Sequence, residues 1–349
     1  MSYITKVENW LQTHTYELDD FMKLDNLQKL KDSKGYSVAV VIPTLEEEGT
    51  IGNVLECLTT RLMKEYSIIN ELVVIDGGSK DKTQLICEQY SELVSFQQQS
   101  NILSSVCNYR GKGEALWKSL YVTKSDIIIY VDSDIKNFDE RFVVGILGPL
   151  LINDSAKFVK GYYRRPYISG SGTRTNEGGR VTELCARPLL NILYPELSGF
   201  IQPLGGEYGG YRNVLENINY TSGYGVEVQT LIEMLEKHGL ESMAQCNLIE
   251  RQHRHQPINS LSKMSSAIMQ TILKRHLDKS NLNSGILIKN LMKENNEFVK
   301  SRSEDQIHCN CSGEDISNDN FKFAMINETV LPNMSEIRQL MTSSDMNLQ

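Results

Sequence analysis

The sequence predicts a doubly wound α/β fold, in which helices cover both faces of a mostly parallel sheet. Three short apolar runs, 38–42, 72–75 and 127–131, alternate with stretches in which apolar residues recur at helical spacing. Strands that are apolar on both faces are typical of parallel sheets. Alternation of such strands with helices indicates right-handed crossover units within one sheet.

The chain divides into four expected segments. They are an N-terminal helical segment (1–36), an α/β domain (37–155), a following region (156–280) and a helical, partly disordered tail (281–349). The expected helices lie near 49–65, 82–94, 113–124, 182–193, 226–238, 260–277, 284–300 and 334–342, and a further strand lies at 158–163. The region after the α/β domain is therefore expected to be mainly helical.

Composition excludes several classes of protein. The chain has 349 residues, 40% of them hydrophobic, and a net charge of −8. Such an acidic chain is a poor nucleic-acid binder, because phosphate contacts require clustered Lys and Arg. No stretch approaches the 18 apolar residues of a membrane span, so no membrane partner is expected. Seven scattered cysteines and no secretory leader predict a reduced, cytoplasmic protein.

A pair of carboxylates follows the third strand. Asp132 and Asp134 are two residues apart, so they point to the same side of an extended chain. Ligands of open α/β sheets bind at the carboxyl ends of the strands. Two carboxylates there suit Mg²⁺ or Mn²⁺ bound to phosphate oxygens. The alternative is a simple helix cap or Asx turn.

Polar loops also follow the first two strands. Residues 43–48 (PTLEEE) end the first strand, and their acids either accept hydrogen bonds from a base and ribose or complement a helix dipole. Residues 76–83 end the second strand and fit an ordinary turn into a helix. Lys112 stands between two glycines at a helix start, where a loop can hold phosphate; an ordinary flexible turn is equally compatible. Neither a P-loop nor a dinucleotide-binding G-x-G-x-x-G follows a strand.

Three further features suit a small anionic ligand. Gly179, Arg180 and Thr182 begin a helix, where guanidinium and backbone N–H groups bind phosphate or carboxylate well. Glu227 lies in the first turn of another helix, where a carboxylate either orients a hydroxyl or acts as a cap. Basic and imidazole groups cluster in 251–255 (RQHRH), and a His there could complete an Asp-led metal site. A solvated basic loop is the alternative for the arginines of 164–180, and a structural role is the alternative for the histidines.

Taken together and in order, these motifs resemble the glucosyl-3-phosphoglycerate synthase family, retaining glycosyltransferases with the GT-A fold. The resemblance covers about residues 38–277 and rests on VVIPTLEEEGTI, the turn after Asp76, GKGEALW, VDSD, GGRVTEL followed by ARPLL, PLGGEYGG, GYGVE and RQHRHQP. It implies transfer of glucose from UDP-glucose or GDP-glucose to 3-phosphoglycerate by a homodimer that needs Mg²⁺ or Mn²⁺. The product would fit a compatible-solute or polysaccharide pathway.

The resemblance also implies that the α/β domain (37–155) binds the nucleotide sugar, that the region 156–280 binds the acceptor, and that single residues have defined roles. The nucleotide would be held by Pro43, Thr44, Leu45, Glu47, Lys112 and Asp132. The metal would be held by Asp134 and His253. The acceptor would be bound by Gly179, Arg180 and Thr182, while Glu227 would orient the glucose and Arg251 would assist with the anions. The expected catalytic residues are thus Asp134, Glu227 and Arg251.

Some positions depart from the family pattern. Gly77 stands where a Ser is usual, PLGGEYGG has more glycine than usual, and His255 stands where Asn is common. These departures leave the donor and acceptor open, so a related transferase for another sugar or acceptor remains an alternative. A non-catalytic sugar-nucleotide sensor on the same fold is a second alternative. A nucleotidyltransferase would need a Gly-rich, Arg-containing loop in place of residues 43–49.

Overall fold

Eight strands form one mixed sheet in the order β1-β11-β6-β9-β5-β2-β3-β4. The computed structural model describes residues 2–169, 172–174, 179–252, 257–276 and 328–346, together with five short strands between 288 and 326. In sheet order the strands are β1 (Thr15–Glu17), β11 (Met243–Glu250), β6 (Phe158–Arg164), β9 (Tyr208–Tyr211), β5 (Ile127–Tyr130), β2 (Val38–Thr44), β3 (Glu71–Asp76) and β4 (Val94–Gln98). The predicted α/β fold is therefore confirmed, and the three strands predicted from apolar runs and the further strand predicted at 158–163 are all present in the sheet.

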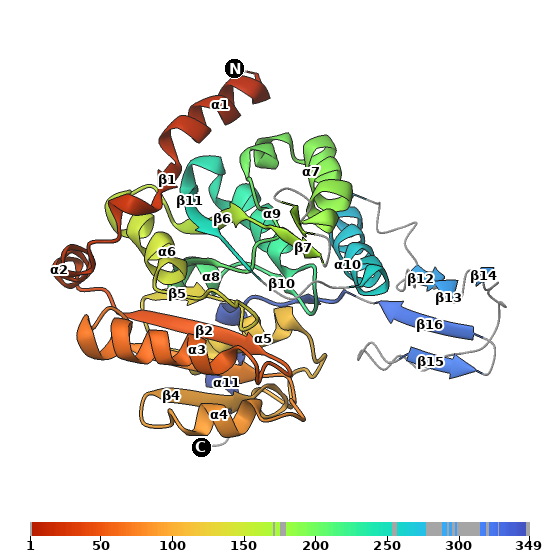
Figure 1. Cartoon of the computed structure of the whole chain (residues 1–349), viewed down its shortest axis with the longest axis horizontal. Coiled ribbons are helices and arrows are strands. Elements are labelled where there is room, and N and C mark those ends of the chain that lie inside the picture. The colour runs from red at the N-terminus through yellow and green to blue at the C-terminus, as the bar shows by residue number, and fades with distance from the viewer. Residues whose placement is uncertain are drawn as a thin grey trace.

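Helices cover both faces of this sheet (Figure 1). One face is packed by helices that include α2 (Leu24–Lys34), α3 (Ile51–Cys57) with its continuation (Leu58–Glu65), and α6 (Arg141–Ile152). The other face is packed by α1 (Tyr3–Thr13), α5 (Lys112–Val122), α7 (Arg187–Leu193), α9 (Val226–His238), α10 (Ile258–His276) and α11 (Met334–Met346). Shorter helices are α4 (Thr83–Glu88) and α8 (Arg212–Leu215).

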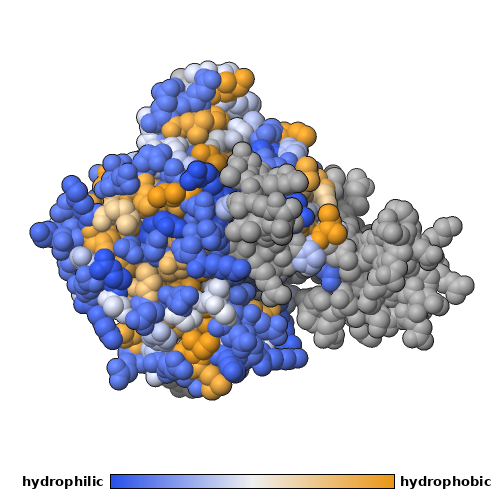
Figure 2. All heavy atoms as spheres, viewed as in Figure 1, coloured by the Kyte–Doolittle hydropathy of each residue, from blue (hydrophilic) through white to orange (hydrophobic). Residues whose placement is uncertain are grey.

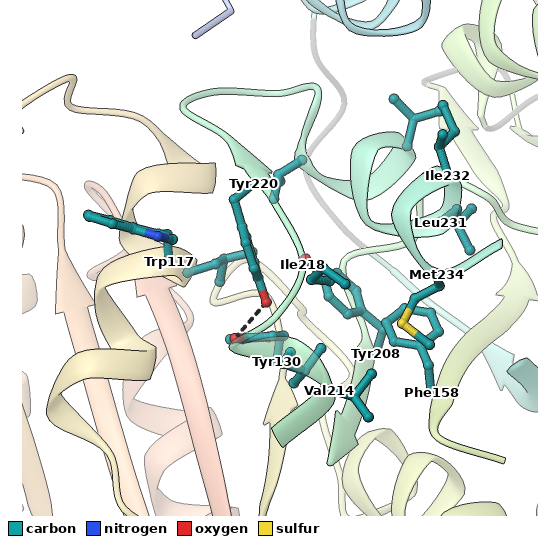
Figure 3. Packing of buried hydrophobic residues seen from close by; sticks show 14 of the residues in the cluster. Trp117, Tyr130, Phe158, Tyr208, Val214, Ile218, Tyr220, Leu231, Ile232 and Met234 are labelled. Atoms are coloured by element: carbon teal, nitrogen blue, oxygen red, sulfur yellow. Dashed lines mark hydrogen bonds between the residues drawn. The ribbon is translucent and has the colours of Figure 1, made fainter. Parts of the chain in front are cut away.

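The strands bury alternate residues in opposite cores. Val40 and Ile129 lie in the core on the α3 and α6 face, whereas Val41 and Ile128 lie in the core on the α5 and α9 face. This follows from the two-residue period of a strand, and it explains why these runs are apolar throughout. Figure 3 shows the second core, where aromatic side chains from β5, β6, β9 and β10 pack together.

Strand β9 is the antiparallel member of the sheet, between β5 and β6. Its glycines lie where no side chain fits: a Cβ on Gly209 would be 2.6 Å from the carbonyl oxygen of Ile128, and one on Gly210 would be 2.6 Å from that of Lys157. The last two glycines of the PLGGEYGG motif (203–210) are therefore needed for the sheet itself. The unusual glycine content has a structural cause.

The prediction that the N-terminal segment (1–36) is helical holds only in part, because β1 separates α1 from α2. β1 pairs in parallel with β11 at the edge of the sheet. Trp10 of α1 is fully buried, and its indole N–H donates to the carbonyl oxygen of Met243 at 2.8 Å. Its ring packs 4.8 Å, centroid to centroid, from that of Phe200. These contacts join the first helix to residues that follow the α/β domain in the sequence.

The helix expected near 284–300 is wrong. The described backbone there forms short strands, β12 (Ile288–Leu291), β13 (Lys293–Glu294) and β14 (Glu297–Phe298), and β12 pairs with β16 (Phe321–Ile326), which also pairs with β15 (Asp315–Asn318). A partner 35 residues away leaves no trace in local spacing, and β-branched Ile288 suits a strand. The disorder expected in this tail falls mostly outside the described residues.

The last segment returns to the main body. β17 (Val330–Leu331) pairs with β10 (Tyr220–Thr221), and α11 packs beside α5 (Figure 1). A small hairpin, β7 (Tyr167–Ser169) and β8 (Gly172–Arg174), completes the described elements. On the face shown in Figure 2, hydrophilic residues predominate and apolar ones are interspersed. Within the described residues, no helix is long and apolar enough to cross a membrane.

Candidate active site

The candidate site lies at the carboxyl edge of the sheet. Strands β2, β3, β5 and β11 are parallel, so the residues after them emerge at one edge. This brings Asp132 and Asp134, which follow β5, to the same edge as Arg251, which follows β11. Since β9 is antiparallel, its first residue and the preceding Glu207 also lie at this edge. The topology thus gathers residues from distant parts of the chain where such sheets bind ligands.

Lys112, in the first turn of α5, links two carboxylates. Its ammonium Nζ lies 2.7 Å from Asp132 Oδ1 and 2.6 Å from Glu227 Oε1, and Glu227 lies in the first turn of α9. All three side chains are mostly buried, so these charges are weakly screened. Lys112 therefore holds the carboxylates of β5 and α9 in a fixed relation.

Arg251 forms the other half of the network. Its Nη2 lies 2.9 Å from Asp132 Oδ2 and 2.5 Å from Asp134 Oδ1. Its Nη1 donates to the Tyr163 hydroxyl at 3.0 Å and lies 3.4 Å from Glu207 Oε1. A buried guanidinium thus bridges both aspartates after β5, and the carboxylates and cations alternate from Glu227 through to Glu207.

The charges shift the pKa of each member. Burial alone would raise the pKa of Asp132, but Lys112 and Arg251 outweigh it and hold that pKa far below its usual range. Burial would lower the pKa of Lys112, but Asp132 and Glu227 hold it well above the usual range. Burial likewise opposes the charge of Arg251, and Glu207 leads the groups that raise its pKa. The carboxylate of Asp132 and both cations are therefore charged at neutral pH.

Sequence reasoning missed three buried members of this site. Glu207 accepts a 2.5 Å hydrogen bond from the Tyr163 hydroxyl, and burial raises the pKa of its carboxyl. Lys160 donates to the carbonyl oxygen of Gly205 at 2.6 Å, and its Nζ lies 4.5 Å from the centre of the Tyr208 ring. Lys160 and Tyr163 lie in the predicted strand at 158–163 and Glu207 lies in the glycine-rich loop, but their approach to Asp132 depends on the position of β9, which local sequence does not reveal.

A close backbone approach fixes Asp132. A Cβ on Gly206 would lie 2.2 Å from Asp132 Oδ2, so only glycine leaves room for this carboxylate. Ser133 donates to the carbonyl oxygen of Pro43 at 3.1 Å and ties the loop after β5 to the end of β2. The backbone of one glycine thus decides where the central aspartate lies.

At the end of β2, an exposed apolar side chain lies next to a buried polar one. The buried Thr44 Oγ1 has no hydrogen-bond partner among the described residues, whereas the neighbouring Leu45 side chain is more than half exposed. Glu47 is held by its backbone N–H, which donates to Thr83 Oγ1 at 2.9 Å, and its carboxylate accepts from Thr50 Oγ1 at 3.2 Å. An exposed apolar side chain beside an unpaired hydroxyl fits the face and edge of a base.

The turn after β3 is satisfied internally, as expected of an ordinary turn. Asp76 accepts hydrogen bonds from the backbone N–H groups of Gly78 and Ser79 and from the Ser79 hydroxyl. Ser79 Oγ in turn accepts from the Glu46 N–H at 2.8 Å. Asp76 therefore shapes this loop and braces the loop after β2.

Gly179, Arg180 and Thr182 lie at the start of a separate helical segment, Thr182–Ala186, which leads into α7. Gly179 has a φ of +81°, and its carbonyl accepts from the Glu183 N–H at 3.0 Å. The Thr182 hydroxyl is buried and has no hydrogen-bond partner in the described part of the chain. An unpaired buried hydroxyl beside an Arg and a helix start suits an anionic group.

The residues present fit a divalent cation that a nucleotide brings with it. Asp134 has a partly exposed hard-oxygen carboxylate, and Mg²⁺ commonly uses one or two carboxylates plus substrate phosphates. The predicted second ligand, His253, lies outside the described residues. Among the residues that the structure describes, no three His, Cys, Asp or Glu side chains gather into a complete cage. Phosphate oxygens would therefore have to complete the coordination.

Comparisons with known proteins agree with this architecture. Residues 39–150 match the model of glycosyl transferase family 2. A glucosyl-3-phosphoglycerate synthase of Petrotoga mobilis is 44% identical over 283 residues, which are 80% of this chain and 86% of the relative. The chain belongs to the glucosyl-3-phosphoglycerate synthase family. Another member, from Mycolicibacterium smegmatis, is 42% identical over 266 residues, 76% of this chain and 85% of the relative. The protein is therefore an enzyme, a hexosyltransferase of this family.

Solved structures extend the likeness to nearly the whole fold. Glucosyl-3-phosphoglycerate synthase of Mycobacterium tuberculosis, in complex with Mn²⁺, UDP-glucose and phosphoglyceric acid, has a TM-score of 0.72 and 31% identity, covering 90% of this chain and 95% of that one. The same enzyme also has a structure with Mg²⁺ and UDP. Mannosyl-3-phosphoglycerate synthase of Rubrobacter xylanophilus has a TM-score of 0.77 and 28% identity, covering 95% and 98%.

The structure thus brings five of the predicted site residues into one network: Lys112, Asp132, Asp134, Glu227 and Arg251. Pro43, Thr44, Leu45 and Glu47 lie in the loop that ends β2, and Pro43 touches the network through Ser133. Gly179, Arg180 and Thr182 stand apart in sequence and in their own helical segment.

Proposed function

We propose that this enzyme transfers glucose from UDP-glucose to the hydroxyl of 3-phosphoglycerate with retention of configuration. The observation that carries the proposal is the alternating network of Glu227, Lys112, Asp132, Arg251 and Asp134 at the carboxyl edge of the sheet. Its support from relatives is the M. tuberculosis structure that contains UDP-glucose, phosphoglyceric acid and Mn²⁺.

The cations of the network suit the leaving group. As the bond between glucose and the diphosphate breaks, negative charge develops on the diphosphate, and preorganised positive groups stabilise it. Lys112 and Arg251 are buried, charged and held in place by carboxylates before the donor arrives. Mg²⁺ or Mn²⁺ held by Asp134, and by His253, would add Lewis-acid stabilisation of the same charge.

The carboxylates of the network are held by cations. Asp132 is paired with Lys112 and Arg251, and Glu227 with Lys112, so neither is a free, exposed nucleophile. We therefore favour a front-face substitution, in which the leaving phosphate helps to deprotonate the acceptor hydroxyl. Glu227 would then orient the glucose hydroxyls, and no covalent glucosyl-enzyme would form.

The acceptor would bind at the start of the helical segment, formed by residues 179–182. Arg180 supplies a guanidinium for bidentate contact with a phosphate or carboxylate, and the unpaired Thr182 hydroxyl supplies a hydrogen bond. The base and ribose of the donor would bind to the end of β2 and the loop after it, at Pro43, Thr44, Leu45 and Glu47. The two substrates would then meet over Asp132 and Arg251.

A second transferase activity has specific support. The Rubrobacter structure that matches this fold is named as a mannosyl-3-phosphoglycerate synthase, so GDP-mannose is a competing donor. GDP-glucose is the other donor to be compared. The sensor alternative is disfavoured, because residues expected to serve acceptor binding and sugar orientation, Arg180, Thr182 and Glu227, accompany the nucleotide site.

The test is UDP release from UDP-glucose and Mg²⁺, with and without 3-phosphoglycerate. We expect UDP release that requires the acceptor, is abolished by EDTA, and is faster than GDP release from GDP-glucose or GDP-mannose. Release that is faster with GDP-mannose would move the enzyme to the mannosyl reaction. Nucleotide binding with no release for any phosphorylated acid would instead support a sensor.

The assembly and location belong to the same proposal. We infer a homodimer in the cytoplasm, with the segments 1–36, 37–155, 156–280 and 281–349 as its functional divisions. The five cysteines that the structure describes are free thiols, as a reducing compartment favours. Light scattering should give about twice the chain mass of 39.6 kDa; a monomer mass would refute the dimer.

A further inference from the structure

A buried carboxylate from the C-terminal segment touches the turn before Glu227. Glu328 is nearly fully buried, and its Oε2 accepts from the backbone N–H of Gly223 at 3.0 Å. A Cβ on Gly223 would lie 2.5 Å from Glu328 Oε1, so the carboxylate packs directly on this backbone. Burial raises the pKa of Glu328, while hydrogen bonds from the N–H groups of Gly223 and Gly225 oppose that rise. The carboxylate thus caps the turn that opens α9.

Helix α10 fixes Glu328 from the other side. The backbone N–H of Glu328 donates to Gln270 Oε1 at 3.1 Å, and the backbone carbonyl of Glu328 accepts from Lys274 Nζ at 2.6 Å. The next residue, Thr329, exchanges two hydrogen bonds with Ser222: the Ser222 N–H donates to its carbonyl at 2.9 Å, and its own N–H donates to Ser222 Oγ at 3.2 Å. The C-terminal segment is therefore held against the 221–225 turn at several points.

The same turn presses on the helix that carries Lys112. A Cβ on Gly111 would lie 2.3 Å from the carbonyl oxygen of Ser222, and one on Gly113 would lie 1.9 Å from that of Thr221. The Glu114 N–H donates to the Ser222 carbonyl at 2.9 Å. Residues 221–225 are thus sandwiched between the C-terminal segment and the first turn of α5.

We propose that Glu328 is a positioning residue of the active site. By holding the 221–225 turn, it sets the relation between Lys112 on α5 and Glu227 on α9, whose side chains are 2.6 Å apart. A carboxylate at a helix N-terminus is favoured by the helix dipole and by charge-assisted bonds to N–H groups. The inference rests on the proposed function, since Lys112 and Glu227 serve the donor there, and it gives residues 328–331 a role.

The experiment compares Glu328→Ala, Glu328→Gln and the matched control Glu336→Ala, on the same segment but with an exposed side chain. UDP release is measured at saturating and limiting donor and acceptor, well below each melting temperature. We expect Glu328→Ala to lower kcat about 10- to 100-fold, as lost supporting contacts commonly do, with both KM values changed less. Glu328→Gln, which keeps an acceptor oxygen, should restore most of kcat, and Glu336→Ala should match wild type.

A second readout is independent of turnover. Hydrogen exchange of peptides covering 221–227 should speed up in Glu328→Ala and return toward wild type in Glu328→Gln. Unchanged kcat and unchanged exchange in Glu328→Ala would overturn the positioning role, as would equal losses in the Ala and Gln variants. If wild-type protein releases no UDP, the proposed function fails, while the exchange comparison still decides whether Glu328 holds this turn.

Discussion

Asp132 lies at the centre of the site because each of its two carboxylate oxygens contacts a different cation. Lys112 contacts Oδ1 and Arg251 contacts Oδ2, and Gly206 leaves just enough room for the carboxylate. Such a network is already organised before the donor binds, so little reorganisation is needed when charge develops on the diphosphate. A mutation of any member of the network should therefore also disturb the residues that it contacts.

Replacing Asp134 by Ala should remove the hard-oxygen ligand for the metal. We expect turnover to fall at least about 100-fold, since loss of mere supporting contacts at metal sites already costs 10- to 100-fold. Metal-dependent UDP binding, measured by calorimetry with and without Mg²⁺, should be lost as well. Asp154→Ala, a control at an exposed aspartate, should leave both unchanged. Normal metal-dependent binding in Asp134→Ala would remove Asp134 from the metal site.

Replacing Arg180 by Ala should separate the acceptor from the donor. A hydrogen bond to a charged group contributes about 1.5–3 kcal/mol, so the KM for 3-phosphoglycerate should rise about 10- to 100-fold. The KM for UDP-glucose serves as the internal control and should change less than about 3-fold. Equal increases in both constants would place Arg180 outside the acceptor site.

Lys160 should make stability depend on pH. Burial lowers the pKa of its ammonium from 10.5 to about 8, Glu227 opposes this shift, and Lys112 adds to it. Between these values the unfolded chain binds more protons than the folded protein, so the free energy of unfolding rises with pH there. In urea titrations, the free energy of unfolding of the wild type should increase between pH 7.5 and 9.5 by roughly 2 kcal/mol more than that of Lys160→Met. Parallel pH profiles for the two proteins would contradict the lowered pKa.

At the level of elements, β9 decides how the site is assembled. It separates β5 from β6 and runs against both, so Glu207 at its start meets Arg251 after β11. A strand of sequence YGGY has weak strand propensity, and its glycines are explained by carbonyl groups of neighbouring strands instead. The strand follows from tertiary contacts.

Replacing Gly209 by Ala should therefore destabilise the sheet. Its Cβ would meet the Ile128 carbonyl oxygen at 2.6 Å, which is backbone and cannot move aside cheaply. Overpacking of this kind costs about 1–3 kcal/mol, and the melting temperature should fall accordingly. Gly49→Ala is the matched control, because no atom lies within 4 Å of its Cβ and its φ is negative or extended. Equal melting temperatures for the two variants would show that β9 tolerates a side chain.

Local pattern predicted most elements, because their burial is visible in sequence. The three apolar runs correspond to β2, β3 and β5, and the further strand predicted at 158–163 is β6. Helical spacing predicted α9 at 226–238 and α10 to within two residues. The local pattern missed β1 and β9, and it placed a helix where β12 lies, because their partners are distant in the chain. The expected helix at 82–94 ends earlier, at Glu88, since Val94 begins β4.

The candidate site shows the same division. Asp132, Asp134 and Lys112 were indicated by their positions at strand ends and helix starts, and the family resemblance added roles for Glu227 and Arg251. Tyr163 and Glu207 were missed, because their hydrogen bond joins β6 to the residue before β9. Local sequence states which groups follow a strand, but it does not state which strands become neighbours.

At the level of the whole molecule, the two ends of the chain close around the sheet. β1 extends the sheet edge beside β11, and the C-terminal segment crosses back to β10 and α5 (Figure 1). The 221–225 turn, which contacts the first turn of α5 and precedes α9, is therefore held by residues from the far end of the chain. Catalysis in this enzyme is expected to require the complete fold.

Proton NMR of the reaction of wild-type enzyme with UDP-glucose, 3-phosphoglycerate and Mg²⁺ tests the proposed transfer most directly. One new anomeric proton with the small coupling constant of an α-glucoside should appear at the rate at which UDP is formed and 3-phosphoglycerate is consumed. A β-anomeric product would contradict the retaining front-face reaction. Free glucose released with 3-phosphoglycerate unchanged would contradict transfer itself.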